Sequence, residues 1–402
     1  MIDKSLKLIN IGNLFSYNTK KEAMVSKKDV EIVIKNGKII EIGRFLNDAD
    51  EIYDCEDKLV TPGFIDCHTH PVFLEDRSKE FEMRIAGKSY EDIAQSGGGI
   101  NNSVKTLRES TFEELKQKVH ARMDTFLRLG TTTIEAKSGY GLSLDSELKS
   151  LEVLDYTNSN HEIDIIPTFM GAHAIPKEYE HNPEEYVNFL CNVMIPEVSK
   201  QGIAKYNDVF CEDGYFNLEQ TKKILQKGLD YGLLPRIHAD EFHNLGGSSL
   251  AGKMKCISAD HLMNINDQDI SKMVESNVPA VLLPGTTFFL GKSNYAPYLK
   301  IKNSRIDVAI ATDYNPGSSN IQSMVFIIAL ATIYMNMDIY EAIKASTYIP
   351  SKLLDIDSTV GSIEIGKNAD IILWNIKDPI DIPYNFSINP VKSVIKNGKI
   401  LF

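Results

Sequence analysis

Cysteine pairs, a leader-like start and long apolar runs are all missing from this sequence. Its five cysteines are widely spaced, odd in number and form no Cys-x-x-Cys pair, which favours reduced thiols over a disulfide framework. Met1–Lys7 holds no apolar stretch of the kind that a secretory leader needs, and no run approaches the roughly 18 apolar residues of a membrane helix. We therefore expect a cytoplasmic protein without a membrane segment.

A basic face is also missing. The 402 residues include 43 Lys and Arg against 55 Asp and Glu, for a formal net charge of −12. Phosphate binding needs a basic surface, so this balance predicts no nucleic acid partner. No Gly-x-Gly-x-x-Gly motif follows a strand near the N-terminus, which weakens a dinucleotide-binding interpretation. With 43% hydrophobic and 24% charged residues, the chain can bury a large core.

Two similar hairpin signals lie near the two ends of the chain. Residues 31–40 place Asn36-Gly37 between β-branched runs, and residues 393–402 repeat the pattern around Asn397-Gly398. Asn-Gly between apolar runs is the strongest short-range hairpin signal. Because isolated hairpins are marginally stable, we expect one small β-sandwich domain built from residues 1–60 and 355–402, not two unrelated surface hairpins.

Between these ends, strand signals alternate with helix signals. Runs suited to strands cover residues 131–137, 164–170, 206–211, 233–238, 255–261, 279–284 and 305–313, and helices are predicted over 111–128 and 218–229. Such alternation indicates a parallel sheet. With nearly eight repeats, residues 61–354 favour an α/β fold of the closed (β/α)8 TIM-barrel type, and an open doubly wound sheet is the alternative.

The first barrel strand ends in two histidines. Phe64, Ile65 and Cys67 form an apolar run after Pro62-Gly63, and His68 and His70 follow. Because side chains alternate along a strand, the two imidazoles share one face and can bind one metal ion together. A His-x-His pair alone fits a strand cap equally well, so the rest of the chain has to decide.

Polar residues collect where the other predicted strands end, and this rim carries the chemistry of barrel enzymes. Counted along the chain, we assign Glu135, Lys137 and Tyr140 to the third strand, His173 to the fourth, Cys211-Glu212-Asp213 to the fifth, His238 and Glu241 to the sixth, Asp260-His261 to the seventh and Asp313 to the eighth. Five of the nine histidines fall at these ends, which packing alone does not explain.

This set of residues suits a catalytic metal, which takes three or four protein ligands and keeps one position open. His68, His70, His238 and Asp313 supply three neutral donors and one carboxylate. Asp313 could bind the metal and also accept the proton of the attacking water, while His261 and Glu241 are candidates to polarise a carbonyl and to move protons. The reaction class predicted is metal-assisted hydrolysis of a C–N or related bond.

Seven segments carry a family resemblance. They are Pro62–Phe73, Lys137–Leu142, Phe169–Ala174, Ile237–Glu241, Ser258–Leu262, Leu283–Thr286 and Thr312–Ser318. They resemble the amidohydrolase superfamily and, within it, the imidazolonepropionase family. The resemblance implies that a metal-bound hydroxide attacks the ring carbonyl of 4-imidazolone-5-propanoate, giving N-formimidoyl-L-glutamate in histidine degradation.

The same resemblance implies roles for individual residues. It implies one zinc or iron ion per chain, held by His68, His70, His238 and Asp313, and it implies a homodimer. It further implies a substrate site lined by Arg77, Tyr140, His173, Glu241, Asn315, Gly317 and Ser318. Arg77 suits the propionate because its guanidinium can grip a carboxylate with two hydrogen bonds.

Some positions depart from the superfamily pattern or leave alternatives open. Many members carry a carboxylated lysine at the end of the fourth strand, but here that strand is assigned to His173, which favours a single metal. Lys137 is interpreted as structural, and Cys67 as a buried apolar residue facing away from the histidines. The alternatives are a ring deaminase or other cyclic amidase on the same scaffold, and a non-catalytic metal-binding relative.

Overall fold

Eight parallel strands form a sheet that nearly closes on itself. In the computed structural model, which describes residues 4–88 and 98–402, these strands follow one another in chain order around the sheet. They are β6 (Phe64–Thr69), β7 (Thr131–Lys137), β8 (Asp164–Ala172), β9 (Tyr206–Cys211), β10 (Leu234–Ala239), β11 (Ala259–His261), β12 (Ala280–Leu282) and β13 (Val308–Ile310). The first and last strands meet where Tyr314 bridges to Thr69 and accepts the His70 amide at 2.8 Å. The predicted parallel barrel is confirmed.

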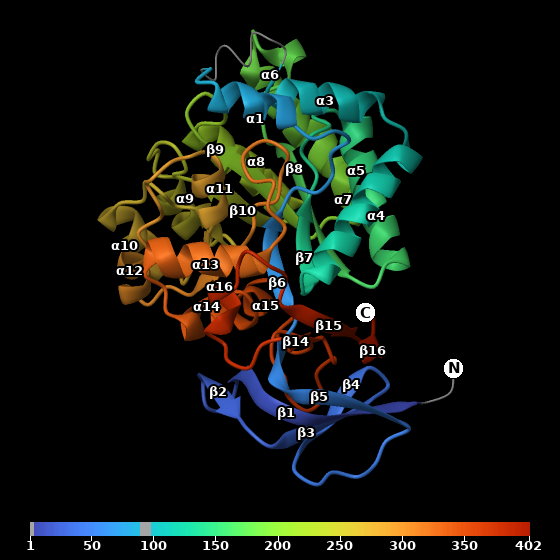
Figure 1. Cartoon of the computed structure of the whole chain (residues 1–402). Helices are drawn as coiled ribbons and strands as arrows, with labels where there is room; N and C mark the ends of the chain where they lie inside the picture. The colour runs from blue at the N-terminus through green and yellow to red at the C-terminus, as the bar shows by residue number, and fades with distance from the viewer. Residues whose placement is uncertain (1–3, 89–97) are drawn as a thin grey trace. The chain divides into compact units, whose positions relative to one another are not determined.

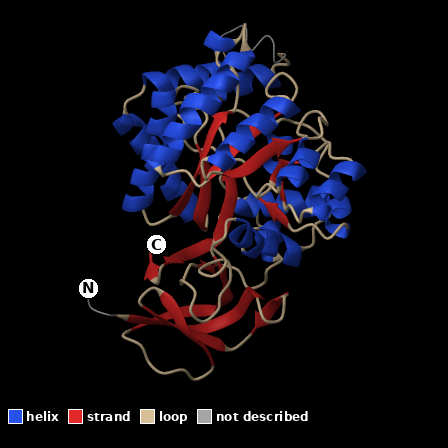
Figure 2. Ribbon diagram, turned by 180° about the vertical axis from the view of Figure 1, so that it is seen from behind, coloured by secondary structure: helices blue, strands red, loops and turns tan. Residues whose placement is uncertain are grey.

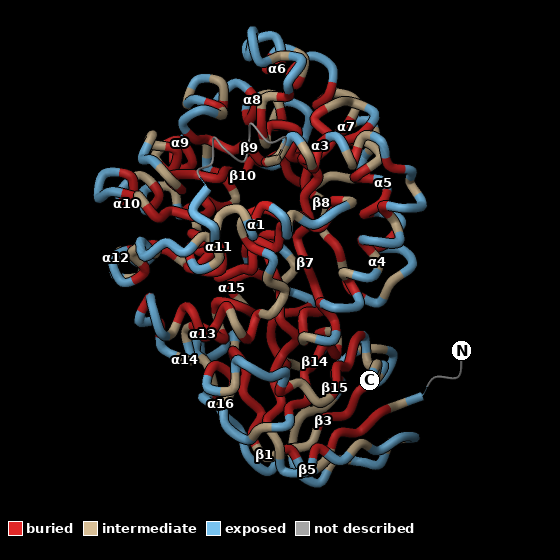
Figure 3. Tube along the Cα trace, turned by 45° about the horizontal axis from the view of Figure 1, so that its top comes forward, coloured by how far each residue is buried: buried red, intermediate tan, exposed pale blue. Residues whose placement is uncertain are grey.

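Helices connect these strands. Between β6 and β10 lie α1 (Ser78–Ile85), α3 (Ile100–Glu109), α4 (Phe112–Arg128), α5 (Leu144–Asn160), η1 (Lys177–Tyr179), α6 (Pro183–Phe189), η2 (Leu190–Met194), α7 (Ile195–Gln201) and α8 (Leu218–Asp230). After β10 come α9 (Gly247–Met254), α10 (Asp267–Glu275), α11 (Pro284–Phe289) and α12 (Tyr298–Asn303). Figure 1 shows α5, α9 and α10 outside the parallel strands, and Figure 2 shows helices on both sides of them. The residues of these strands are largely buried (Figure 3).

The predicted numbering of the barrel strands was wrong. Residues 131–137 form the second strand, because residues 78–128 run through α1, α3 and α4, and the described part of this stretch adds no strand to the sheet. The short β12 is the seventh strand, which the predicted numbering omits. His173 therefore follows the third strand, and the fourth ends in Cys211 and Glu212. The fourth strand still has no lysine at its end.

Strands from both ends of the chain form a second sheet. They are β1 (Ser5–Asn18), β2 (Ala23–Lys27), β3 (Val30–Lys35), β4 (Lys38–Gly43), β5 (Glu51–Pro62), β14 (Ile371–Trp374), β15 (Val391–Lys396) and β16 (Lys399–Ile400). Their order is β16-β15-β14-β5-β1-β3-β4, and β2 pairs with β1 (Figure 1). All described pairings are antiparallel except that of β1 with β5. The predicted composite β part is confirmed, and its strands lie on one hydrogen-bonded sheet.

The two predicted hairpins are present, and their turns touch. Lys35 pairs with Lys38 around Asn36-Gly37, and Lys396 pairs with Lys399 around Asn397-Gly398. A Cβ on Gly37 would lie 2.9 Å from the Asn397 carbonyl oxygen, and Gly37 also has a φ of +75°. Glycine is therefore required there for both its conformation and the close approach.

The helices of the C-terminal part are α13 (Met324–Met335), α14 (Ile339–Ala345), α15 (Tyr348–Leu353) and α16 (Asp381–Tyr384). The chain divides into two compact units. One comprises Met1–Cys67, Asp124–Ile134 and Gln322–Phe402, and the other comprises His68–Met123 and Glu135–Ile321. The predicted domain boundaries near residues 60 and 355 stay a prediction. All residues of the candidate site fall in the second unit.

Candidate metal centre and active site

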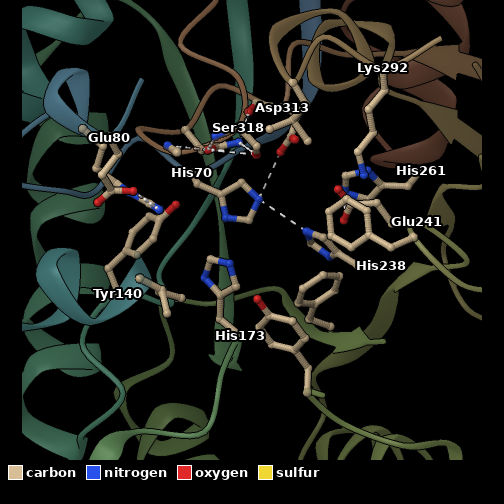
Figure 4. A pocket seen from close by; sticks show the side chains of 18 of the residues that line it. His70, Glu80, Tyr140, His173, His238, Glu241, His261, Lys292, Asp313 and Ser318 are labelled. Carbon is tan, nitrogen blue, oxygen red and sulfur yellow. Dashed lines mark hydrogen bonds and ion pairs between the residues drawn. The ribbon is translucent and has the colours of Figure 1, made fainter. Parts of the chain in front are cut away.

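Three histidines and one aspartate converge at the carboxyl ends of β6, β10 and β13. The Nε2 atoms of His68, His70 and His238 lie 3.1–3.4 Å from one another. Asp313 Oδ1 lies 3.5 Å from the Nε2 of His68 and 3.4 Å from that of His70. Figure 4 shows His70, His238 and Asp313 turned toward one another. All four side chains are buried.

The spacing and chemistry of these atoms fit a metal ion. A tetrahedral centre with metal–nitrogen bonds of about 2.0–2.1 Å places its ligand atoms roughly 3.3–3.4 Å apart. His68 Nδ1 lies 2.7 Å from Asp260 Oδ2, and His238 Nδ1 lies 3.0 Å from Asp208 Oδ1. Because carboxylates accept, both Nδ1 atoms donate, and both Nε2 atoms carry lone pairs. Lone pairs that face each other at 3.1 Å repel unless a cation lies between them, so the cluster could bind a metal ion.

Burial keeps these histidines neutral, the form that binds metal. Removal from water lowers the pKa of His68 well below 6.5, that of His70 to about 3 and that of His238 to about 4. For His238, the neighbouring carboxylate of Asp208 works in the opposite direction and raises the pKa. The cost of desolvation is the larger effect at all three positions.

His261 and Glu241 form the next part of the site. Ligand atoms of His261, His68 and His238 all lie within 4.8 Å of one another, and His261 Nε2 is 3.6 Å from Glu241 Oε2. Burial lowers the pKa of His261 to about 3. Burial also raises the pKa of Glu241 well above 4.5, and the charge of Asp313 adds to this shift. A neutral imidazole and a carboxyl group with a raised pKa thus lie side by side.

Two buried ring nitrogens of the site make no hydrogen bond to the described residues. They are the Nδ1 atoms of His70 and His261. Buried polar atoms are usually paired, and these two belong to residues that line the same cavity, where a bound group could supply the missing partner. The backbone supports this interpretation, since His261 and Asp313 have φ values of +79° and +52°. Conformations of this kind cost free energy and concentrate at functional sites.

One cavity of about 560 Å³ connects the predicted site residues. Every one of them except the fully enclosed His68 lines it: His70, Arg77, Tyr140, His173, His238, Glu241, His261, Asp313, Asn315, Gly317 and Ser318. The apolar part of the cavity wall includes Phe210, Tyr215, Phe242 and Leu290. A few polar groups that converge within an apolar cavity are typical of a small-molecule site.

Arg77 lies against Gly317 and binds Glu80. Its Nε donates to Glu80 Oε2 at 2.8 Å, and the other Glu80 oxygen accepts the Gly99 amide at 2.8 Å. A Cβ on Gly317 would lie 2.3 Å from Arg77 Nη1, so the absence of a side chain at Gly317 makes room for the guanidinium. The guanidinium of Arg77 is therefore already paired with a carboxylate of this chain.

Asn315 shapes the loop that carries Gly317 and Ser318. Its side-chain oxygen accepts the backbone amides of Gly317 and Ser318 at 2.9 and 2.7 Å, and its Nδ2 donates to the Asp313 carbonyl at 2.7 Å. Opposite this loop, His173 Nδ1 donates to the Gly139 carbonyl at 3.0 Å, which leaves its Nε2 as an acceptor toward the cavity. Through these three hydrogen bonds, Asn315 fixes the conformation of the loop at residues 313–318.

A sequence model of the amidohydrolase family matches residues 59–401. The chain belongs to the amidohydrolase family.

Relatives and solved structures agree with this assignment. The imidazolonepropionase of Geobacillus kaustophilus is 42% identical over 377 residues, which cover 92% of this chain and 89% of the relative. That of Brevibacillus brevis is 46% identical over 351 residues, covering 87% and 82%. Among structures, guanine deaminase from C. acetobutylicum with bound guanine aligns with a TM-score of 0.72 at 18% identity, over 99% and 100% of the two chains. An adenosine deaminase from Xanthomonas campestris with bound zinc gives 0.70 at 16%, over 98% and 92%; both structures show likeness of fold.

In this amidohydrolase, the described helices include none long and apolar enough to cross a membrane.

The residues that contact the site residues were missed in the sequence analysis. Asp208, Asp260 and Arg236 were given no role, although all are fully buried. The signal was available, because Arg236 precedes His238 by two positions on β10 and so shares its face of the strand. Thr286, which donates to Asp313 Oδ2, was missed as well.

Proposed function

We propose that this amidohydrolase hydrolyses 4-imidazolone-5-propanoate to N-formimidoyl-L-glutamate in histidine degradation. The observation that carries the proposal is one cavity with the histidine–aspartate cluster and a guanidinium group, Arg77, in its wall. The relatives named imidazolonepropionase support the choice of substrate. The reaction adds one water across the ring amide bond, so that the carbonyl carbon gains the oxygen and the ring nitrogen gains a proton.

We propose one zinc or iron ion per chain, with His68, His70, His238 and Asp313 as its ligands. Three imidazoles and a carboxylate suit both metals. When bound, such an ion supplies Lewis acidity, which polarises a carbonyl and makes water a stronger nucleophile near neutral pH.

We assign the proton transfers to Asp313 and Glu241, and the polarisation of the carbonyl to His261. Asp313 accepts the proton of the attacking water, while the Thr286 hydroxyl binds its Oδ2 and fixes the carboxylate. Glu241 hydrogen-bonds a ring N–H and delivers a proton to the leaving nitrogen, a role that its raised pKa supports. Neutral His261 lies next to Glu241 and donates a hydrogen bond to the carbonyl oxygen.

The propionate group is proposed to bind Arg77. The substrate carboxylate shares the guanidinium with Glu80, which accepts from both Nε and Nη2 and leaves Nη1 beside Gly317. Tyr140 and Ser318 offer hydroxyl donors, and His173 offers a further polar contact, from the same cavity wall. We also propose a cytoplasmic homodimer that binds no nucleic acid, in keeping with the net charge of −12.

Arg77→Ala is expected to raise KM by about 10-fold to 100-fold with little change in kcat. The change removes a charge-assisted contact of about 1.5–3 kcal/mol that the substrate makes before and during the reaction. Steady-state kinetics with the imidazolone measures the effect. The control is Lys79→Ala, which removes an exposed cation two residues away. An unchanged KM in Arg77→Ala would mean that the propionate binds elsewhere.

Removal of the metal is expected to abolish turnover, and about one equivalent of zinc or iron per chain is expected to restore it. The reason is that the cluster offers three histidine nitrogens and one carboxylate to a single cation. Dialysis against a chelator, followed by titration with each metal and by metal analysis, measures both quantities. Full activity in metal-free protein would contradict the proposed centre, and a need for two equivalents would contradict its single metal.

The proposed reaction is tested by the loss of the imidazolone ultraviolet absorbance with metal-replete protein. Formation of N-formimidoyl-L-glutamate without ammonia is the expected outcome. Release of ammonia from an amino-substituted ring instead would identify a deaminase. Absence of turnover on the imidazolone by protein that contains its metal would reject the proposed substrate.

A further inference from the structure

The interior of the barrel just below the histidine cluster is ionic. Five charged side chains there have a relative exposure of 0%: Glu135, Lys137, Asp208, Arg236 and Asp260. They come from β7, β9, β10 and β11, and Lys137 and Arg236 each lie two residues from a charged or ligating neighbour on the same strand face. Bulky branched side chains usually fill the interior of such barrels. The five residues above are called the ionic layer.

The ionic layer has two arms with the same order of groups. In the first, Lys137 Nζ lies 3.0 Å from Asp208 Oδ2, and Asp208 Oδ1 accepts from His238 Nδ1 at 3.0 Å. In the second, Arg236 Nη2 donates to Asp260 Oδ2 at 2.9 Å, and the same oxygen accepts from His68 Nδ1 at 2.7 Å. Each arm therefore runs from a cation through a carboxylate to one histidine.

Glu135 connects the two arms. Its Oε1 accepts from Lys137 at 2.7 Å and lies 3.6 Å from Arg236 Nη1. The five linked side chains carry three negative and two positive charges, and Asp313 adds a further carboxylate above them. This excess of negative charge favours a cation at the position where the Nε2 atoms meet.

Stability alone is a poor explanation for this layer. Desolvation of buried ions offsets most of their mutual attraction, so an apolar core of the same volume is often as stable. Both arms of this layer, however, end at Nδ1 of a histidine whose Nε2 faces the proposed metal position. The common end points indicate a role at the centre.

We propose that the ionic layer positions His68 and His238 for metal binding, by holding both rings in the Nδ1–H tautomer with Nε2 directed at the metal. Asp208 and Asp260 are the positioning residues that contact the rings. Lys137 and Arg236 hold these carboxylates and are not themselves ligands. The inference rests on the proposed metal centre, but it concerns groups outside the ligand set.

Asp208→Asn and Asp260→Asn test the proposal through metal affinity. An amide can turn its NH2 group toward the ring, so it no longer enforces the tautomer. Each variant is expected to bind zinc about 10-fold to 100-fold more weakly in competition with a chromogenic chelator. The cobalt-loaded variants are also expected to show shifted absorption bands, a change that a loss of stability alone would not cause.

The matched control is Asp370→Asn. Asp370 and Lys396 form a buried ion pair at 2.6 Å in the second sheet. The control loses the same charge from a buried pair and is expected to keep the zinc affinity of the native chain. Equal zinc affinity in folded Asp208→Asn, Asp260→Asn and native protein would overturn the proposal.

Histidine tautomers in the native chain provide a test that does not depend on how the aspartate variants fold. Nitrogen-15 NMR of the metal-free protein, with the two rings assigned through His68→Gln and His238→Gln, should show a protonated Nδ1 and an unprotonated Nε2 in both. An Nε2–H tautomer in either ring would overturn the proposal. If the native chain bound no metal but showed the expected tautomers, the proposed centre would fail while the positioning of the rings would stand.

Discussion

Asp313→Asn is expected to lower kcat by at least about a thousand-fold. The carboxylate has two roles in the proposed reaction, as a metal ligand and as the acceptor of the proton from water. Loss of a general base alone costs about 10²–10⁴-fold. The amide is also a weaker ligand and cannot accept the proton, and Thr286 would lose its carboxylate partner. Kinetics on protein reconstituted with excess metal separates the catalytic loss from a simple loss of the ion.

The control for this variant is Asp307→Asn. Asp307 precedes β13, whereas Asp313 follows it, so the control makes the same chemical change at the opposite end of one strand. Residues at that end of a barrel strand contribute to stability and not to chemistry. Its kcat is expected to stay within about two-fold of the native value. A fully active Asp313→Asn protein would remove Asp313 from both roles.

Glu241→Gln is expected to lower kcat by about 10²–10⁴-fold while metal content stays at the native level. Glutamine keeps the size of the side chain and a hydrogen bond to the ring but cannot deliver a proton. The structure places Glu241 beside His261 and outside the four-residue cluster, so the ion should remain. Single-turnover kinetics and metal analysis of the same sample measure the two quantities.

The control for Glu241→Gln is Glu275→Gln, which alters an exposed carboxylate paired with Lys272 on α10. It is expected to leave kcat unchanged. If Glu241→Gln lost its metal, Glu241 would have to be counted as a ligand. If it lost neither metal nor activity, the proton for the leaving nitrogen would have to come from His261 or Asp313.

Local patterns predicted the parts of this protein that local physics determines. The alternation of β6 places His68 and His70 on one face, and Asn-Gly signals place the turns at residues 36–37 and 397–398. The numbering of the barrel strands failed because it allowed for a strand before residues 131–137, where the described chain is helical, and gave no number to the run at 279–284 that contains β12. The alternation of β10 indicates that Arg236 shares a strand face with His238, but the carboxylate that Arg236 pairs with could not be predicted. Arg236 and Asp260 are neighbours only because β10 and β11 pair in the folded sheet.

The contacts of Arg77 likewise could not be predicted from local sequence patterns. Its resemblance to a substrate-binding position was visible in the sequence, but its ion pair with Glu80 and its contact with Gly317 were not. The first depends on one turn of α1, and the second depends on a residue more than two hundred positions away. The sequence suggests which side chains face the substrate. Only the fold shows that one of them, Arg77, is already paired with Glu80.

The contact between the turns at Gly37 and Gly398 means that the second sheet cannot be completed until the C-terminal strands are synthesised. Ala369 joins them, since its amide donates to the Gly37 carbonyl at 2.8 Å and its carbonyl accepts the Gly398 amide at 3.2 Å. The first strands to be synthesised therefore lack these contacts until the last strands are made, and the edge of β5 that pairs with β14 stays open while the barrel is synthesised. Open edges of this kind invite pairing with other chains. A chain that ends before β14 would consequently keep the β5 edge open and aggregate, even though every residue of the candidate site had already been made.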